Sequence, residues 1–157
     1  MVVCGVATTG MAQSGAIDLK SEFPIAQNSC FEYLAGDAAP IKALSRNGYR
    51  VKARGKRVRA YKASSKSIPR GRRTSIEVVV GKSARKACEI HVWAAPGRLA
   101  DQLHADFMSR VLLKGFVPLP KRGLGNQRFA KDGHQFTFFG VRKKGTPLVS
   151  WTMSRVK

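Results

Sequence analysis

The chain has 157 residues and carries 29 Lys or Arg against 9 Asp or Glu, a formal net charge of +20. Hydrophobic residues at 43% and charged residues at 24% exclude a compositionally disordered chain. No run approaches the ~18 apolar residues of a membrane span, which excludes a transmembrane protein. The length suits one domain, and the one-sided charge indicates an anionic partner rather than a particular fold.

The first residues resemble the end of a signal peptide. Gly10 and Ala12 are small residues two positions apart, as around a signal-peptide cleavage site, but the positive region that normally opens such a peptide is missing. Two interpretations remain: the remnant of a longer signal peptide, or an ordinary terminus. We expect a signal-peptide remnant over 1–12, a flexible segment over 13–24 and a single domain over 25–157.

Removal of residues 1–12 would leave two cysteines, Cys30 and Cys88. An even count in an exported chain is typical of one disulfide, and this one would close a loop that holds most of the cationic segment. The alternative is a pair of reduced core cysteines in a cytosolic protein. The two cysteines and three histidines have no recognised ligand spacing, so no metal site is expected.

Two segments resemble each other in the order of their elements. The first runs from Asp37 to Asn47 and predicts a helix, and the second helix is predicted from residue 97 to Lys114. Each helix is followed by glycine and an aromatic residue, Gly48-Tyr49 and Gly115-Phe116, and then by an extended segment. Residues 25–34 are expected to add one or two helical turns around Cys30.

β-Branched and alternating patterns predict two hairpins, one from 75–80 and 88–93 and the other from 135–141 and 147–156. The fold class is therefore α+β: two layers, an antiparallel sheet of about five to six strands, and two main helices on one face. The repeated order of elements is weak evidence for an internal α-β-β duplication.

Positive charge is concentrated between Lys42 and Lys86, where sixteen Lys or Arg face a single acid, Glu77. Within this segment five cations alternate with small apolar residues, but the alternation shifts by one residue at Gly55. We expect one strand with a β-bulge at Gly55-Lys56, which returns all five cations to one face over roughly 26 Å at ~3.3 Å per residue. The alternative is a solvated edge strand whose charges prevent aggregation.

The expected polyanion-binding residues are these five cations together with three on a following basic loop: Arg50, Lys52, Arg54, Arg57, Arg59, Arg70, Arg72 and Arg73. Three aromatic residues are candidates for exposed rings that stack on a ligand: Tyr61, Trp93 and Phe139.

The sequence contains few candidate catalytic groups. Asp101, His104 and Asp106 share the second helix, but no Ser or Cys nucleophile is linked to them by the sequence. Gly81-Lys82-Ser83 matches only the end of a phosphate-binding loop. No enzyme activity and no cofactor are predicted.

Two function classes therefore compete. The first is a non-catalytic periplasmic or secreted binding or assembly domain that docks on a polyanion: envelope glycan, lipid head groups or an acidic protein. The alternative is a cytoplasmic nucleic-acid-binding domain that uses the same basic face and aromatic stacking.

Overall fold

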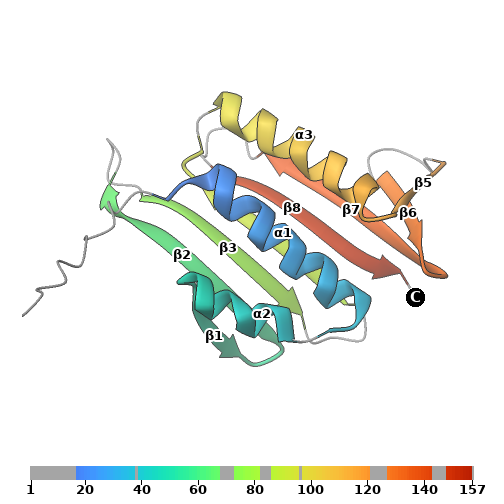
Figure 1. The fold of residues 1–157 in the computed structure, drawn as a ribbon, viewed down its shortest axis with the longest axis horizontal. Coiled ribbons are helices and arrows are strands. Elements are labelled where there is room, and N and C mark those ends of the chain that lie inside the picture. Colours follow the sequence, from blue (N-terminus) through green and yellow to red (C-terminus); the bar gives the residue numbers. More distant parts are fainter. Residues whose placement is uncertain are drawn as a thin grey trace, which may run out of the picture.

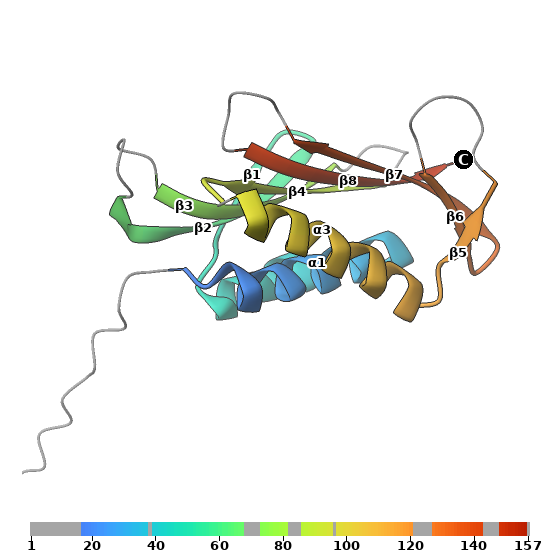
Figure 2. The ribbon, with the colours of Figure 1, turned by 90° about the horizontal axis from the view of Figure 1, so that it is seen from above.

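The computed structural model describes residues 17–37, 39–67, 73–81, 86–95, 97–120, 127–142 and 148–156. These residues form an α+β fold in which one antiparallel sheet of eight strands has its helices on one face (Figures 1 and 2). The elements in chain order are α1 (Leu19–Ala35), α2 (Ala39–Ala43), the 3₁₀ turn η1 (Leu44–Asn47), β1 (Arg50–Arg54), β2 (Arg57–Ser67), β3 (Arg73–Gly81), β4 (Ala87–Trp93), α3 (Gly97–Leu113), β5 (Val117–Leu119), β6 (Gln127–Lys131), β7 (His134–Arg142) and β8 (Leu148–Val156).

The strands lie in the order β1-β2-β3-β4-β8-β7-β6-β5. Both hairpins predicted from the sequence are confirmed, as β3 with β4 and β7 with β8. The expected five to six strands were too few, because β5 and β6 have only three and five residues and β5 contains Pro118. Such short segments carry almost no period-two signal.

α1 is longer than the one or two turns expected, with 17 residues. The Asp18 carboxylate caps its first turn by accepting a hydrogen bond from the Lys20 backbone N–H at 3.0 Å. Leu19 and Phe23 are already buried, so residues 19–24, which were expected to belong to a flexible segment, form the first turns of α1 in the structure. Residues 1–12, the expected signal-peptide remnant, lie outside the described residues.

The two glycine–aromatic exits are confirmed. Gly48 and Gly115 have φ of +79° and +80°, a left-handed conformation that favours glycine. In both, the following aromatic N–H, of Tyr49 or Phe116, donates to a carbonyl in the preceding turn. The first helix differs from the prediction because it divides into α2 and η1.

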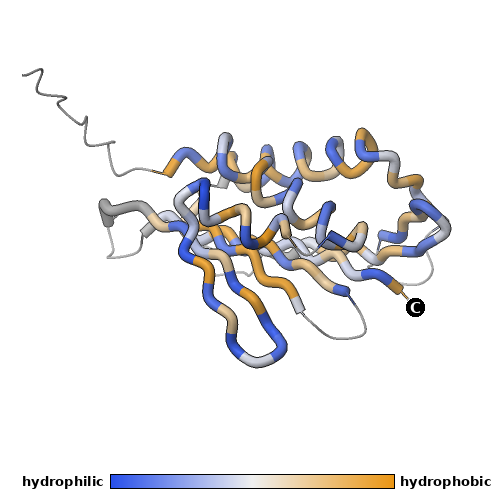
Figure 3. The backbone as a smooth tube through the Cα atoms, turned by 60° about the horizontal axis from the view of Figure 1, so that its bottom comes forward, coloured by the Kyte–Doolittle hydropathy of each residue, from blue (hydrophilic) through white to orange (hydrophobic). Residues whose placement is uncertain are grey.

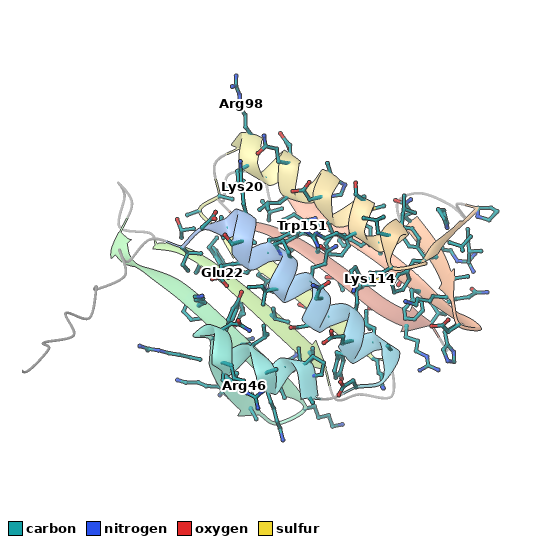
Figure 4. All side chains as sticks on the ribbon, in the orientation of Figure 1. Lys20, Glu22, Arg46, Arg98, Lys114 and Trp151 are labelled. Carbon is teal, nitrogen blue, oxygen red and sulfur yellow. A yellow bond between two sulfur atoms is a disulfide. The ribbon has the colours of Figure 1, made fainter. Side chains whose placement is uncertain are left out.

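The core lies between the sheet and the helices. Phe23 of α1 packs on Trp151 of β8 with ring centroids 4.6 Å apart, and Trp151 stacks with Phe107 of α3 at 6.2 Å. In Figure 4, Trp151 lies between α1 and α3. Burial of such large rings is the main stabilising contribution available to a domain of this size.

A disulfide joins Cys30 of α1 to Cys88 of β4 across this core, with Cα atoms 5.5 Å apart. Both cysteines are buried. The predicted pairing is therefore present in the structure. A buried disulfide is consistent with an oxidising extracytoplasmic compartment.

The order of elements is repeated in the two halves of the sheet. A helical segment, α2–η1 or α3, leads through Gly and an aromatic residue into four strands, and the two four-strand units meet at β4 and β8. α1 contacts α2, α3, β3 and β4, and covers the middle of the sheet (Figure 1). The repeated unit is thus longer than the α-β-β unit expected from the sequence.

Side-chain contacts repeat as well. Lys62 lies over the Tyr49 ring, 5.5 Å from its centroid, and donates to the carbonyl of Asn47 at 2.8 Å. In the second half, Lys131 lies 4.9 Å from the Phe116 centroid and donates to the carbonyl of Lys114 at 2.5 Å. Each lysine therefore binds the last carbonyls of a helix and packs on the aromatic residue after it.

Candidate functional site

The face of the sheet turned away from α1 and α3 carries the predicted cations. β1 and β2 form a hairpin in which Lys52 lies opposite Arg59 and Arg54 lies opposite Arg57. Residues directly opposite in an antiparallel pair share one face, so all five alternating cations are on the open side. We call this set the basic ladder: Arg50, Lys52, Arg54, Arg57 and Arg59.

The predicted β-bulge at Gly55-Lys56 is wrong. These two residues form the turn between β1 and β2, and Gly55 has φ of +56°. Two-residue hairpins favour glycine at this first turn position. A hairpin restores the alternation as a bulge would, but it folds the five cations into two adjacent rows, with the β1 row roughly 13 Å long at ~3.3 Å per residue.

The basic ladder is exposed and almost uncompensated. All five side chains are exposed, and the only ion pair of the ladder with a described acid joins Arg59 Nη1 to Glu77 Oε1 at 3.4 Å. Like charges directly opposite each other on a sheet repel. The hairpin therefore carries unfavourable charge that an anionic ligand would relieve. Figure 3 shows the hairpin reaching outward, with hydrophilic and hydrophobic residues alternating along it.

Beside the ladder, β3 and β4 carry a compact ionic cluster. His91 lies between two carboxylates, with Nδ1 at 3.6 Å from Glu77 and Nε2 at 3.1 Å from Glu89. Hydrogen bonding to Glu77 and then to Glu89 raises the pKa of His91 to about 9. His91 is therefore protonated at neutral pH, and its bond lowers the pKa of Glu89.

The sequence patterns considered above did not predict this cluster. The signal was available in the predicted hairpin. Aligning 75–80 with 88–93 places Glu77 directly opposite His91, as observed. Glu77 and Glu89 place negative charge on β3 and β4, beside the hairpin. The strongly positive surface of the β1–β2 hairpin therefore does not continue across these two strands.

The three candidate aromatic residues are exposed, at 39% for Tyr61, 37% for Trp93 and 48% for Phe139. They lie on three different strands, β2, β4 and β7, and all face the open side. Only Tyr61 adjoins the basic ladder, directly opposite Arg50. The rings therefore do not form one continuous stacking platform.

The expected closing loop falls mostly outside the described residues. Arg70 and Arg72 lie outside them, and Arg73 is the first residue of β3, with its side chain not described. Their role in binding stays a prediction.

The other two histidines, His104 and His134, have hydrogen-bond partners within the fold. His104 Nδ1 accepts a hydrogen bond from the Trp151 indole N–H at 3.2 Å. Arg155 contacts both ring nitrogens of His134, at 2.8 and 2.6 Å. Within the described residues, no group of three or more His, Cys, Asp or Glu side chains has an arrangement that could hold a metal ion, and this includes the cluster around His91.

Comparison with known proteins adds no relative: no protein-family model, no curated protein and no solved structure matches the chain. Among the described helices, none combines the length and apolarity needed to cross a lipid bilayer.

Proposed function

We propose that the protein is a non-catalytic, strongly basic extracytoplasmic binding or assembly domain that docks on a polyanionic partner through the open face of the β1–β2 hairpin. One observation carries the proposal. The basic ladder places five exposed cations in two adjacent rows, and only Arg59 forms an ion pair with a described carboxylate.

The energetic support is the like-charge pairing. Two cross-strand pairs of like charge, Lys52 with Arg59 and Arg54 with Arg57, lower the free energy of unfolding of the free protein. Cross-strand charges of one sign are unfavourable. An anion bound over both rows would replace repulsion by attraction. A ligand that binds only the folded chain also raises its stability. Four of the five cations are Arg, whose planar fork suits carboxylate, sulfate and phosphate groups.

The disulfide supports the extracytoplasmic location in this proposal. Cys30 and Cys88 are fully inside the core, where an oxidised pair is typical of exported proteins. Envelope glycans, lipid head groups and acidic proteins are the anions that such a compartment offers.

The alternative is an intracellular nucleic-acid-binding domain. The observation in its favour is the exposure of Tyr61 beside Arg50, which would allow a base to stack next to a phosphate contact. The separation of Tyr61, Trp93 and Phe139 onto different strands weakens it.

The test compares a heparin fragment with a single-stranded oligonucleotide of the same charge, using wild type and Tyr61→Ser. The proposal expects both ligands to raise the melting temperature, with heparin binding unchanged by the substitution. The alternative expects oligonucleotide binding to fall selectively, because stacking contributes about 1–3 kcal/mol per base. Failure of both ligands to bind would overturn the proposal.

A further inference from the structure

The two outer strands of the sheet, β1 and β5, occupy equivalent places in the repeated architecture but differ in chemistry. Both follow a Gly–aromatic exit, and among the described strands each pairs only with the next one in the chain. The register matches position by position: β5 has Val117, Pro118 and Leu119 where β1 has Arg50, Val51 and Lys52.

β1 presents free backbone groups along its outer side. Arg54 and Arg57 flank a two-residue turn and so form a hydrogen-bonded pair. Because hydrogen-bonded and non-hydrogen-bonded pairs alternate, the N–H and C=O groups of Val51 and Ala53 point away from β2. Among the described residues, neither takes part in a backbone hydrogen bond outside the sheet.

The equivalent edge on β5 is closed to a further strand. Pro118 stands where β1 has Val51, so the outward N–H is absent there. Proline on an edge strand is a common way to prevent strand addition. The protein therefore blocks one edge with proline and leaves the other with its donors intact and cations beside them.

We propose that β1 accepts, as a ninth strand, an extended acidic segment of a partner protein that carries Asp or Glu at every second residue. This inference rests on the proposed function and names its partner. Residues of the added strand opposite Arg50, Lys52 and Arg54 would form non-hydrogen-bonded pairs, in which side chains approach most closely. Since strands share the same rise, an alternating acidic segment matches all three cations at once.

The same edge rejects a second copy of this chain. Pairing of β1 with β1 would bring cations directly opposite cations, which is unfavourable. A glycan or nucleic acid would use the charges of the ladder but none of the outward N–H groups of Val51 and Ala53.

The experiment measures fluorescence anisotropy with a labelled eight-residue peptide of alternating Glu and Val. Three further probes are the same peptide N-methylated on its Val amides, which lie opposite Val51 and Ala53 when Glu lies opposite the cations, a peptide with the four Glu in one block, and a heparin fragment. We expect N-methylation to weaken binding about tenfold or more, because several backbone hydrogen bonds are lost together. The blocked sequence should also bind more weakly.

Ala53→Pro removes an outward N–H from β1, as Pro118 does in β5, and Ala53→Val is its matched control because it keeps the N–H. Ala53→Pro should lose peptide affinity and keep heparin affinity, while Ala53→Val keeps both. If the N-methylated peptide binds wild type as tightly as the unmodified one, strand addition is wrong and the polyanion face remains. If neither peptide nor heparin binds in a salt-dependent way, the proposed function is wrong as well.

Discussion

Arg54 and Arg57 lie directly opposite each other across the turn of the β1–β2 hairpin, and neither has an ion pair with a described acid. Like charges in this arrangement repel, and an anion lying over both residues would relieve the repulsion. The Arg59 guanidinium, in contrast, already contacts Glu77.

Arg54→Glu should therefore stabilise the free protein. The substitution converts a repulsive cross-strand pair into an attractive one, and we expect the free energy of unfolding to rise by about 0.5–1 kcal/mol. Urea denaturation at low salt measures the change. The gain should shrink in high salt, because exposed charges are screened. Equal stability of variant and wild type at low salt would contradict the repulsion.

Stability should depend on pH through His91. Its folded-state pKa of about 9 lies above the ordinary value of 6.5, so its contribution is fully present below about pH 6.5 and is lost as pH rises through about 9. The loss should reach about 2–3 kcal/mol by the linkage relation. His91→Gln should flatten this part of the profile, and a titration of the His91 ring by NMR reads the pKa directly. A ring that titrates near 6.5 would refute the cluster.

The disulfide should be both present and important. Intact-mass analysis after alkylation without reduction should leave Cys30 and Cys88 unmodified. Replacing both by Ala should lower the free energy of unfolding by about 2–4 kcal/mol. Alkylation of both thiols in protein from an oxidising compartment would contradict the pairing.

The repeated lysines offer a matched pair of variants. Lys62 forms an ion pair with the Glu22 carboxylate, whose side chain is only 14% exposed, whereas Lys131 contacts a carbonyl and a ring. Lys62→Met would leave Glu22 without its cation, so we expect a loss of about 3 kcal/mol. Lys131→Met should cost about 1 kcal/mol. Thermal and urea denaturation of the two variants measure both losses. A smaller loss for Lys62→Met than for Lys131→Met would contradict the prediction and would show that Glu22 is well solvated.

Local patterns predicted much of the fold. The β-branched segments, the alternation of Val149, Trp151 and Met153, and the glycine–aromatic exits each depend on neighbours in sequence, and each is confirmed. The length of α1 was not predicted, because its buried residues pack on β3, β4 and α3, contacts that become visible only after the sheet assembles.

The candidate site was likewise predictable where it depends on neighbours in sequence and unpredictable where it depends on strand pairing. Alternation alone predicted that the five cations share a face, but it could not separate a bulge from a turn at Gly55, since both restore the same alternation. The Glu77–His91–Glu89 cluster depends on the register between β3 and β4 and on the side chains that this register brings together.

We propose that binding is localised on the basic ladder, and the salt dependence of affinity distinguishes such a site from a diffuse positive field. Replacing Lys52, Arg54 and Arg57 by Ser is compared with replacing Lys20, Arg98 and Lys114, three exposed cations of α1 and α3 and the turn after α3. Figure 4 labels the three control residues, with Arg98 pointing away from the body of the protein. Both triple variants lose the same charge.

The measurement is the affinity for a heparin fragment across a series of salt concentrations. Each lost contact lowers the log–log slope by about 0.7–0.9, so the ladder variant should lose roughly two to three units and the control variant almost none. Both variants should fold, and the ladder variant should be slightly the more stable of the two because its cross-strand repulsion is removed. Equal losses in the two variants would contradict the account, because they would show a diffuse positive field and no site on the β1–β2 hairpin.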